Sequence, residues 1–249
     1  MRGARAAARP LLALFALLAV VHLGALLGGA ETLAHLTKPA LMPVLAGYVL
    51  ARGGPPLLAV ALLLGCGGDS LLLSDAEPAF LVGMGSFAAG HVCYLVLFFR
   101  GRPHLDRRRT VPLAIAYAAA CLGTVALLWP DLAADLRVPV AGYSLLLTGM
   151  ALGATRAGLR VALGGALFLI SDTLIAGRIA EWPQLPAPQF WIMLTYIAAQ
   201  ALLADGLLRA ERPPLRVGRP VAVADEARTR PAGADHPAAA GGSATREVR

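Results

Sequence analysis

The sequence is poor in charged residues. Only 15% of its 249 residues are Asp, Glu, Lys or Arg, whereas a soluble globular protein carries about 25%. The charges lie in short segments between long apolar runs, and the mean hydropathy is +0.67. This pattern argues against a soluble protein and favours a polytopic integral membrane protein.

Cysteine and lysine are also scarce, and this limits the kinds of functional site that we expect in the protein. Cys66, Cys93 and Cys121 all lie inside apolar runs. An odd, unpaired set argues against both a disulfide framework and a zinc site, so we interpret them as small core residues. No Gly-x-Ser-x-Gly motif is present, which argues against a serine hydrolase. Lysine occurs once, as Lys38, and we expect no cofactor and no metal.

Apolar runs predict an all-α domain of eight transmembrane helices within residues 1–210. The runs lie near 11–29, 36–51, 56–74, 79–99, 111–129, 138–155, 158–176 and 188–208. The first run also fits a signal peptide, because basic residues precede it and small residues follow it. Residues 211–249 are rich in Pro, Ala, Gly and Arg, and we expect them to form a disordered cytoplasmic tail.

Basic residues predict the orientation. Of the 22 basic residues, 19 fall in the loops on one side of the spans or in the terminal segments. The other side carries Lys38, Arg137 and Arg178 with six acidic residues, and the three tryptophans lie there too. Those residues are Glu31, Asp75, Glu77, Asp131, Asp135, Glu181, Trp129, Trp182 and Trp191. The basic side is expected to be cytoplasmic, so both termini lie in the cytoplasm of a cell-membrane protein. The net charge of +7 therefore does not indicate nucleic-acid binding.

Two spans end with similar polar motifs. The third run ends GGDSLLLS, with Asp69, and the seventh ends LISDTLIAG, with Asp172. At about 1.5 Å per residue, both aspartates lie roughly 9 Å below the outer helix end. The helices that follow carry His91 and Gln200 after an aromatic residue and a run of small residues. This similarity predicts two parallel four-helix repeats.

Ionisable residues inside a membrane usually face the bundle interior or a water-filled cavity. Asp69, Asp172, Lys38 and His91 are such residues, although each could instead hold helices together by hydrogen bonds. Serine and threonine beside the aspartates are expected to be local hydrogen-bond partners rather than nucleophiles. These are Ser70, Ser171 and Thr173. The nearby glycines either permit close helix packing or leave room for a substrate.

Together these segments resemble the YhhN-like lysoplasmalogenase family over roughly residues 11–208. The matching residues are Thr37-Lys38-Pro39, Met42-Pro43, Gly68-Asp69, Phe80, Gly83, Phe87, His91, Tyr94, Phe168, Ser171-Asp172, Tyr196 and Gln200. The resemblance implies an eight-span membrane enzyme that hydrolyses the vinyl-ether bond of lysoplasmalogens. Its products would be a fatty aldehyde and a glycerophospho-ethanolamine or -choline, and its partners the lysophospholipid substrate and membrane lipids.

The resemblance also implies the residues of the site. Asp69 and Asp172 are the expected catalytic residues. The expected substrate-binding residues are Lys38, His91, Tyr94, Ser171 and Gln200. Lys38, the only lysine, is a candidate ligand for the lipid phosphate.

Vinyl-ether hydrolysis requires an acid and a carboxylate. Protonation of the distal alkene carbon gives an oxocarbenium-like species, which water then attacks. Two aspartates in one cavity can divide these roles, as two carboxyl groups do in glycoside hydrolysis. Two other classes are possible from the sequence: a proton-coupled transporter, since parallel repeats with intramembrane polar residues also occur there, and a purely structural membrane protein.

Overall fold

The computed structural model describes residues 2–74, 77–100 and 107–210, and this part of the chain is helical. The predicted tail, residues 211–249, and Asp75 lie outside the described residues. The eight helices and one 3₁₀ turn are α1 (Arg2–Leu27), α2 (Glu31–Ala51), α3 (Pro56–Leu71), α4 (Glu77–Arg100), α5 (Arg107–Leu128), α6 (Ala134–Ala154), η1 (Thr155–Ala157), α7 (Leu159–Ile179) and α8 (Pro188–Ala210). The predicted all-α, multi-pass membrane fold is confirmed.

Helix α3 is shorter than its neighbours. Within the described residues, seven helices are long and apolar enough to cross a membrane, and α3 is an apolar helix of 16 residues. The apolar run predicted a helix to Ser74, but the helix ends at Leu71, three residues earlier. The chain then turns, with the Leu73 amide donating to the Ser70 carbonyl and the Ser74 amide to the Leu71 carbonyl. Hydropathy alone does not register this turn, because Leu72 and Leu73 are as apolar as the helix before them.

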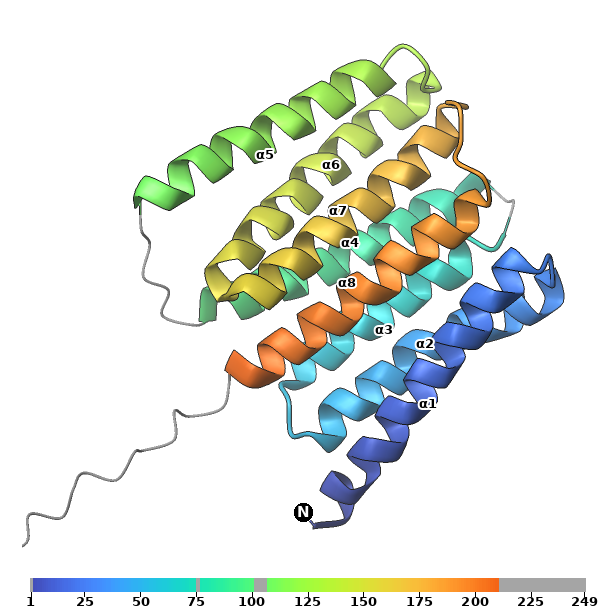
Figure 1. Ribbon diagram of the computed structural model, residues 1–249. Helices are drawn as coiled ribbons and strands as arrows, with labels where there is room; N and C mark the ends of the chain where they lie inside the picture. The colour runs from blue at the N-terminus through green and yellow to red at the C-terminus, as the bar shows by residue number, and fades with distance from the viewer. Residues whose placement is uncertain (1, 75–76, 101–106, 211–249) are drawn as a thin grey trace, which may run out of the picture. The chain divides into compact units, whose positions relative to one another are not determined.

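Neighbouring helices in the chain pack side by side in one bundle (Figure 1). Helices α1 to α4 pack in sequence, α4 then packs on α6, and α6, α7 and α8 follow. Helix α8 also contacts α1 and α2, while α5 makes its main contact with α6. Because α2 contacts α8 and α4 contacts α6, the two predicted repeats would meet symmetrically. The repeat arrangement itself stays a prediction.

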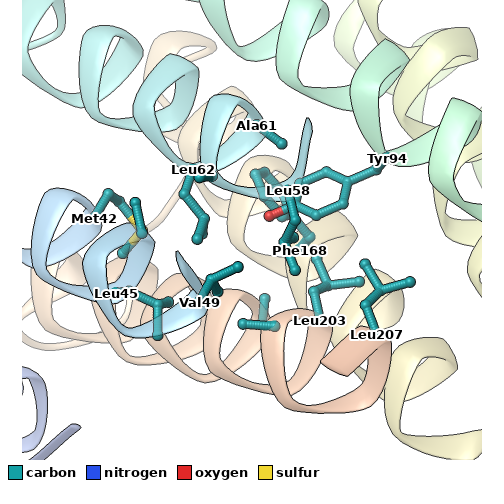
Figure 2. Packing of buried hydrophobic residues seen from close by; sticks show 14 of the residues in the cluster. Met42, Leu45, Val49, Leu58, Ala61, Leu62, Tyr94, Phe168, Leu203 and Leu207 are labelled. Carbon is teal, nitrogen blue, oxygen red and sulfur yellow. The ribbon is translucent and has the colours of Figure 1, made fainter. Parts of the chain in front are cut away.

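The core lies where α2, α3, α4, α7 and α8 meet. Figure 2 shows aliphatic side chains of α2, α3 and α8, with Tyr94 of α4 and Phe168 of α7 among them. Glycine brings the backbones close: a Cβ on Gly164 would stand 3.0 Å from the Ala199 carbonyl oxygen of α8. Close backbone approach of this kind is what stabilises helix pairs in a membrane, where lipid is as apolar as leucine. Large apolar side chains such as Leu17, Val20 and Leu122 accordingly stay exposed on the outside.

The three tryptophans mark one end of the bundle, which we call the tryptophan end. Trp129 follows α5, Trp182 follows α7 and Trp191 lies in the first turn of α8. The Trp182 indole donates to Asp131, and the Trp191 indole donates to the Pro186 carbonyl. Helices α3 and α7 both end here, so Asp69 and Asp172 lie in the same part of the bundle.

Candidate active site in the helix bundle

A polar cavity of about 350 Å³ opens between α2, α3, α4, α7 and α8 near the tryptophan end. It is lined by Lys38, Asp69, Leu72, Ser74, Phe80, Phe87, Ser171, Asp172, Ile175, Arg178, Ile179, Gln189, Ile192, Met193 and Tyr196. Both intramembrane aspartates therefore contribute to one cavity. A concave site with a few convergent polar groups in an otherwise apolar wall is the usual form of a small-molecule site.

Asp69 forms an ion pair across the α2–α3 interface. Lys38 Nζ lies 3.7 Å from Asp69 Oδ1, and both side chains are largely buried. The neighbouring Cys66 thiol donates to the Pro39 carbonyl at 3.2 Å, which ties α3 to α2 beside the pair. Asp69 Oδ2 is also buried, yet it has no hydrogen-bond partner among the described residues. Since buried oxygens are normally satisfied, this one is available as an acceptor within the cavity.

Asp172 has a different kind of partner. The hydroxyl of Tyr143, on α6, donates to Asp172 Oδ2. His91 Nε2, on α4, lies 3.0 Å from the same hydroxyl. Because the single phenolic proton is directed at Asp172, the tyrosine oxygen accepts from His91 Nε2–H. Three helices thus hold a chain of hydrogen bonds from His91 through Tyr143 to Asp172, and no Lys, Arg or His lies within ion-pair distance of Asp172 among the described residues.

Aromatic rings fix the histidine in this chain. The His91 ring stands edge-on to Phe168, with centroids 4.7 Å apart, and it is 1% exposed. Phe168 in turn packs edge-to-face on Phe87 and Tyr196. Edge-to-face pairs restrict ring orientation and add to the stability that burial provides. The His91 ring therefore has little freedom to rotate, and its hydrogen bond holds the Tyr143 hydroxyl in place.

Four of the seven site residues expected from the sequence line the polar cavity: Lys38, Asp69, Ser171 and Asp172. The Ser171 hydroxyl donates to the Ile192 carbonyl of α8, so its proton is already used. The other three lie behind the cavity wall. His91 contacts Tyr143 as described, and the Tyr94 hydroxyl donates to Gln200 Oε1 at 2.5 Å.

The remaining hydroxyls near the aspartates make local contacts. Ser70 donates to the Cys66 carbonyl and Thr173 to the Leu169 carbonyl, each four residues earlier in its own helix. This agrees with the prediction that they are hydrogen-bond partners rather than nucleophiles.

The site glycines mainly serve packing. A Cβ on Gly68 would meet the Phe87 ring at 2.4 Å, and one on Gly65 would meet the Tyr196 hydroxyl at 2.7 Å. Both positions are thus occupied by aromatic side chains of the cavity wall. Of the two readings possible from the sequence, the structure favours close packing over room for a substrate at these glycines.

Sequence reasoning missed three polar contributors: Tyr143, Tyr196 and Arg178. Tyr143 ends an Ala-Gly-Tyr sequence at 141–143 that also occurs at 46–48, and this similarity gives no sign of a carboxylate partner. The Tyr196 hydroxyl is buried in the wall, beside the side chains of Asp69 and Gln200. Arg178 is exposed at the tryptophan end of the cavity, and no ion pair is found for it among the described residues. Arg178 is one of three basic residues on the predicted outer side, which otherwise carries acidic residues. This contrast was the feature of the sequence that could have identified it.

Chemically, the cavity offers two carboxyl groups in unlike surroundings. Asp69 faces a cation, and Asp172 faces a neutral hydroxyl. An unpaired charge is costly in an apolar interior, whereas a paired one is far less so. The arrangement therefore suits a proton donor and a carboxylate acting on one substrate. Within the described residues, no three His, Cys, Asp or Glu side chains gather as metal ligands would.

The chain is similar in sequence to known proteins. Residues 33–207 match the model of the YhhN family. A Mycobacterium bovis protein named lysoplasmalogenase is 33% identical over 174 residues, which cover 66% of this chain and 64% of that protein. Human lysoplasmalogenase TMEM86B is 32% identical over 161 residues, covering 65% of this chain and 67% of that protein. The match thus spans a little under two thirds of the mycobacterial relative.

A human protein named lysoplasmalogenase TMEM86A is also similar, at 30% identity over 179 residues, 67% of this chain and 71% of that protein. No solved structure matches the chain. The family model covers all five helices that line the polar cavity, including Lys38, Asp69 and Asp172. On this match, the chain is a member of the YhhN family.

Proposed function

We propose that the protein is a membrane lysoplasmalogenase, which hydrolyses the vinyl-ether bond of a lysoplasmalogen-type lysolipid. The products are a fatty aldehyde and a glycerophospholipid head, such as glycerophospho-ethanolamine or -choline. The names of the YhhN relatives support this activity. The observation that carries it is the presence of Asp69 and Asp172 in the wall of one cavity.

Asp172 is the general acid in this proposal. Its Oδ2 accepts from Tyr143, which leaves Oδ1 to carry a proton toward the cavity. That proton passes to the distal alkene carbon of the vinyl ether, and the electron pair of the ether oxygen forms an oxocarbenium ion. The Tyr143 hydroxyl then stabilises the new Asp172 carboxylate, because hydrogen bonds to a charged acceptor are stronger than neutral ones.

Asp69 is the carboxylate that completes the reaction. Lys38 balances its charge at Oδ1, and Oδ2 accepts a proton from the water that attacks the oxocarbenium carbon. In the resulting hemiacetal, the proton held by Asp69 passes to the glycerol oxygen as the carbon–oxygen bond breaks, and the hemiacetal hydroxyl gives its proton to Asp172. This gives the aldehyde and the free glycerol hydroxyl and restores both aspartates to their starting states. Overall one water is consumed, and no oxidant or reductant is needed.

The ion pair changes the role that we assign to Lys38. The sequence suggested a phosphate ligand, but the lysine already has Asp69 as a partner. We therefore propose Lys38 as the counter-ion of Asp69 and Arg178 as the first contact of the lipid phosphate. Arg178 is exposed at the mouth of the cavity, and its planar guanidinium suits phosphate binding.

The test is an assay of purified protein in nanodiscs. Release of fatty aldehyde from a 1-alkenyl lysophospholipid is expected, while the saturated 1-alkyl ether, which cannot be protonated at an alkene, should stay intact. Absence of aldehyde release under conditions where the protein is folded would refute the proposal. A transporter would instead accumulate a solute in proteoliposomes without releasing aldehyde, so an uptake assay beside the hydrolysis assay separates the two classes.

A further inference from the structure

A second cavity of about 280 Å³ lies beside the polar one, between α4, α5, α6 and α7. Its wall is mostly aliphatic and aromatic, with contributions such as Met84, Cys121, Leu128, Leu147 and Ile170. Asp172 is the one carboxylate among the described residues that line it. We call this space the apolar cavity.

The two cavities adjoin along α7 and α4 and share part of their walls. Six residues line both of them: Leu72, Phe80, Phe87, Asp172, Ile175 and Ile179. Asp172 is the carboxyl group of this shared wall, whereas Asp69 and Lys38 line the polar cavity only. The molecule therefore has two adjoining cavities, one polar and one apolar, with the Asp172 carboxyl group in the wall that they share.

A linear hydrocarbon chain attached to a polar head matches this division. The vinyl-ether bond is the point at which the chain of a lysoplasmalogen joins its glycerol. A lipid whose head lies in the polar cavity and whose chain lies in the apolar cavity must place that bond beside Asp172. On the basis of the proposed function, we infer that the apolar cavity is the binding site for the alkenyl chain of the substrate.

Helix α5 forms one wall of this site. It stands at one edge of the bundle and packs mainly against α6 (Figure 1). Its Cys121 side chain is 6% exposed and lines the apolar cavity, whereas the adjacent Leu122 is 67% exposed on the outer surface. These two neighbours provide a matched pair of sites for substitution. A larger side chain at Cys121 narrows the apolar cavity, whereas a larger side chain at Leu122 changes only the outer surface.

The first experiment measures hydrolysis of long-chain (octadecenyl) and short-chain (octenyl) lysoplasmalogens by Cys121→Phe and Leu122→Phe. Cys121→Phe should lower kcat/KM for the long chain by about tenfold or more, on the scale that one or two misfitted methylenes produce in an apolar pocket, and should affect the short chain much less. Leu122→Phe should leave the ratio of the two substrates as in the unaltered protein. An unchanged chain-length profile in folded Cys121→Phe overturns the inference.

The second experiment does not require catalysis. In a Cys66→Ala/Cys93→Ala background, the rate at which methyl methanethiosulfonate modifies Cys121 is measured in nanodiscs with added saturated 1-octadecyl or 1-octyl lysophospholipid. The octadecyl ether should slow modification several-fold more than the octyl ether. Equal rates with and without either lipid overturn the inference, even if aldehyde is released. Protection without any aldehyde release supports the chain site and refutes only the proposed reaction.

Discussion

At the scale of single residues, the site depends on how two carboxyl groups are partnered. Asp69 has Lys38, and Asp172 has Tyr143 backed by His91. One partner is a cation, and the other is a neutral donor. The same residue type therefore enters the cavity in two electrostatic settings, which is how proteins commonly assign the two roles of acid and carboxylate.

The carboxyl groups are the first to test. Asp69→Asn and Asp172→Asn keep side-chain size while removing the acidic proton, so each should insert and fold yet lose about 10²–10⁴ in kcat. Because the pair acts on one bond, the double variant should be little slower than either single one. Aldehyde release is the measurement, with Asp205→Asn at the other end of α8 as a control. Retained activity in either single variant would remove that residue from the chemistry.

Lys38 is tested by stability as well as rate. Lys38→Met leaves Asp69 buried without its counter-ion, which should cost roughly 1–3 kcal/mol of stability, together with most of the turnover. Adding Asp69→Asn should restore the stability but not the activity. Thermal unfolding of purified protein measures the first effect. A Lys38→Met protein that keeps its kcat and loses only affinity for substrate would instead favour a phosphate ligand.

We expect Tyr143 to act as a positioning residue for Asp172, to which its hydroxyl donates a hydrogen bond. Tyr143→Phe keeps the ring against His91 but removes the hydroxyl between the two groups. Loss of a hydrogen bond to a charged group is worth about 1.5–3 kcal/mol, so kcat should fall about 10–100-fold with little change in KM. Tyr117→Phe on α5 is the matched control, since no side-chain hydrogen bond is found for it in the described part of the chain. Equal kcat values for the two variants would contradict this role.

At the scale of the helix, close approach of α3 and α4 creates the cavity wall. Gly68 lies directly under the Phe87 ring. Gly68→Ala should therefore push the two helices apart and lower both stability and activity. Gly85 faces open space on α4, so Gly85→Ala should be neutral. Melting temperatures and aldehyde release of the two variants, measured side by side, decide the matter; a neutral Gly68→Ala would mean that the ring can move aside.

The helices and the two intramembrane aspartates were predictable from the sequence, but the side chains that contact these aspartates were not. Apolar runs predicted the eight helices because membrane helices must be long and hydrophobic, and the chain alternation placed both aspartates toward one end. The predicted equal depth of the two aspartates is wrong, because α3 ends two residues after Asp69 whereas α7 continues for seven residues after Asp172. Tyr143 was missed because a tyrosine in an apolar run looks like a core aromatic. Its contact with Asp172 depends on α6 packing between α4 and α7, and no local pattern records that packing.

Helices α1 and α3 show that a hydropathy pattern does not predict where a helix begins and ends. Helix α1 begins well before its predicted apolar run, at Arg2, because arginine and alanine are good helix formers that hydropathy does not count. Helix α3 ends early, as described above. The Lys38–Asp69 contact was equally hidden, since it depends on the relative rotation of α2 and α3 about their axes.

At the scale of the whole molecule, charge asymmetry sets a topology that reporters can check. The basic loops lie at the end opposite the tryptophans, so both termini are expected in the cytoplasm. Reporter fusions after Arg109 and after Arg209 should both give a cytoplasmic signal. A fusion in the Trp182 loop should report the outside. An external signal at Arg109 or Arg209 would invert or break the eight-span topology.

The short helix α3 has a consequence for how water and lipid meet. Its 16 residues extend about 24 Å, less than the hydrocarbon thickness of about 30 Å. Hydrophobic mismatch of this kind is relieved by local thinning of the bilayer. Such thinning is expected beside Asp69, two residues before the helix ends, where it would draw the head-group region toward the mouth of the polar cavity. The proposed hydrolase would then take its water and release its polar product where the membrane is thinnest, while the aldehyde would stay dissolved in the lipid.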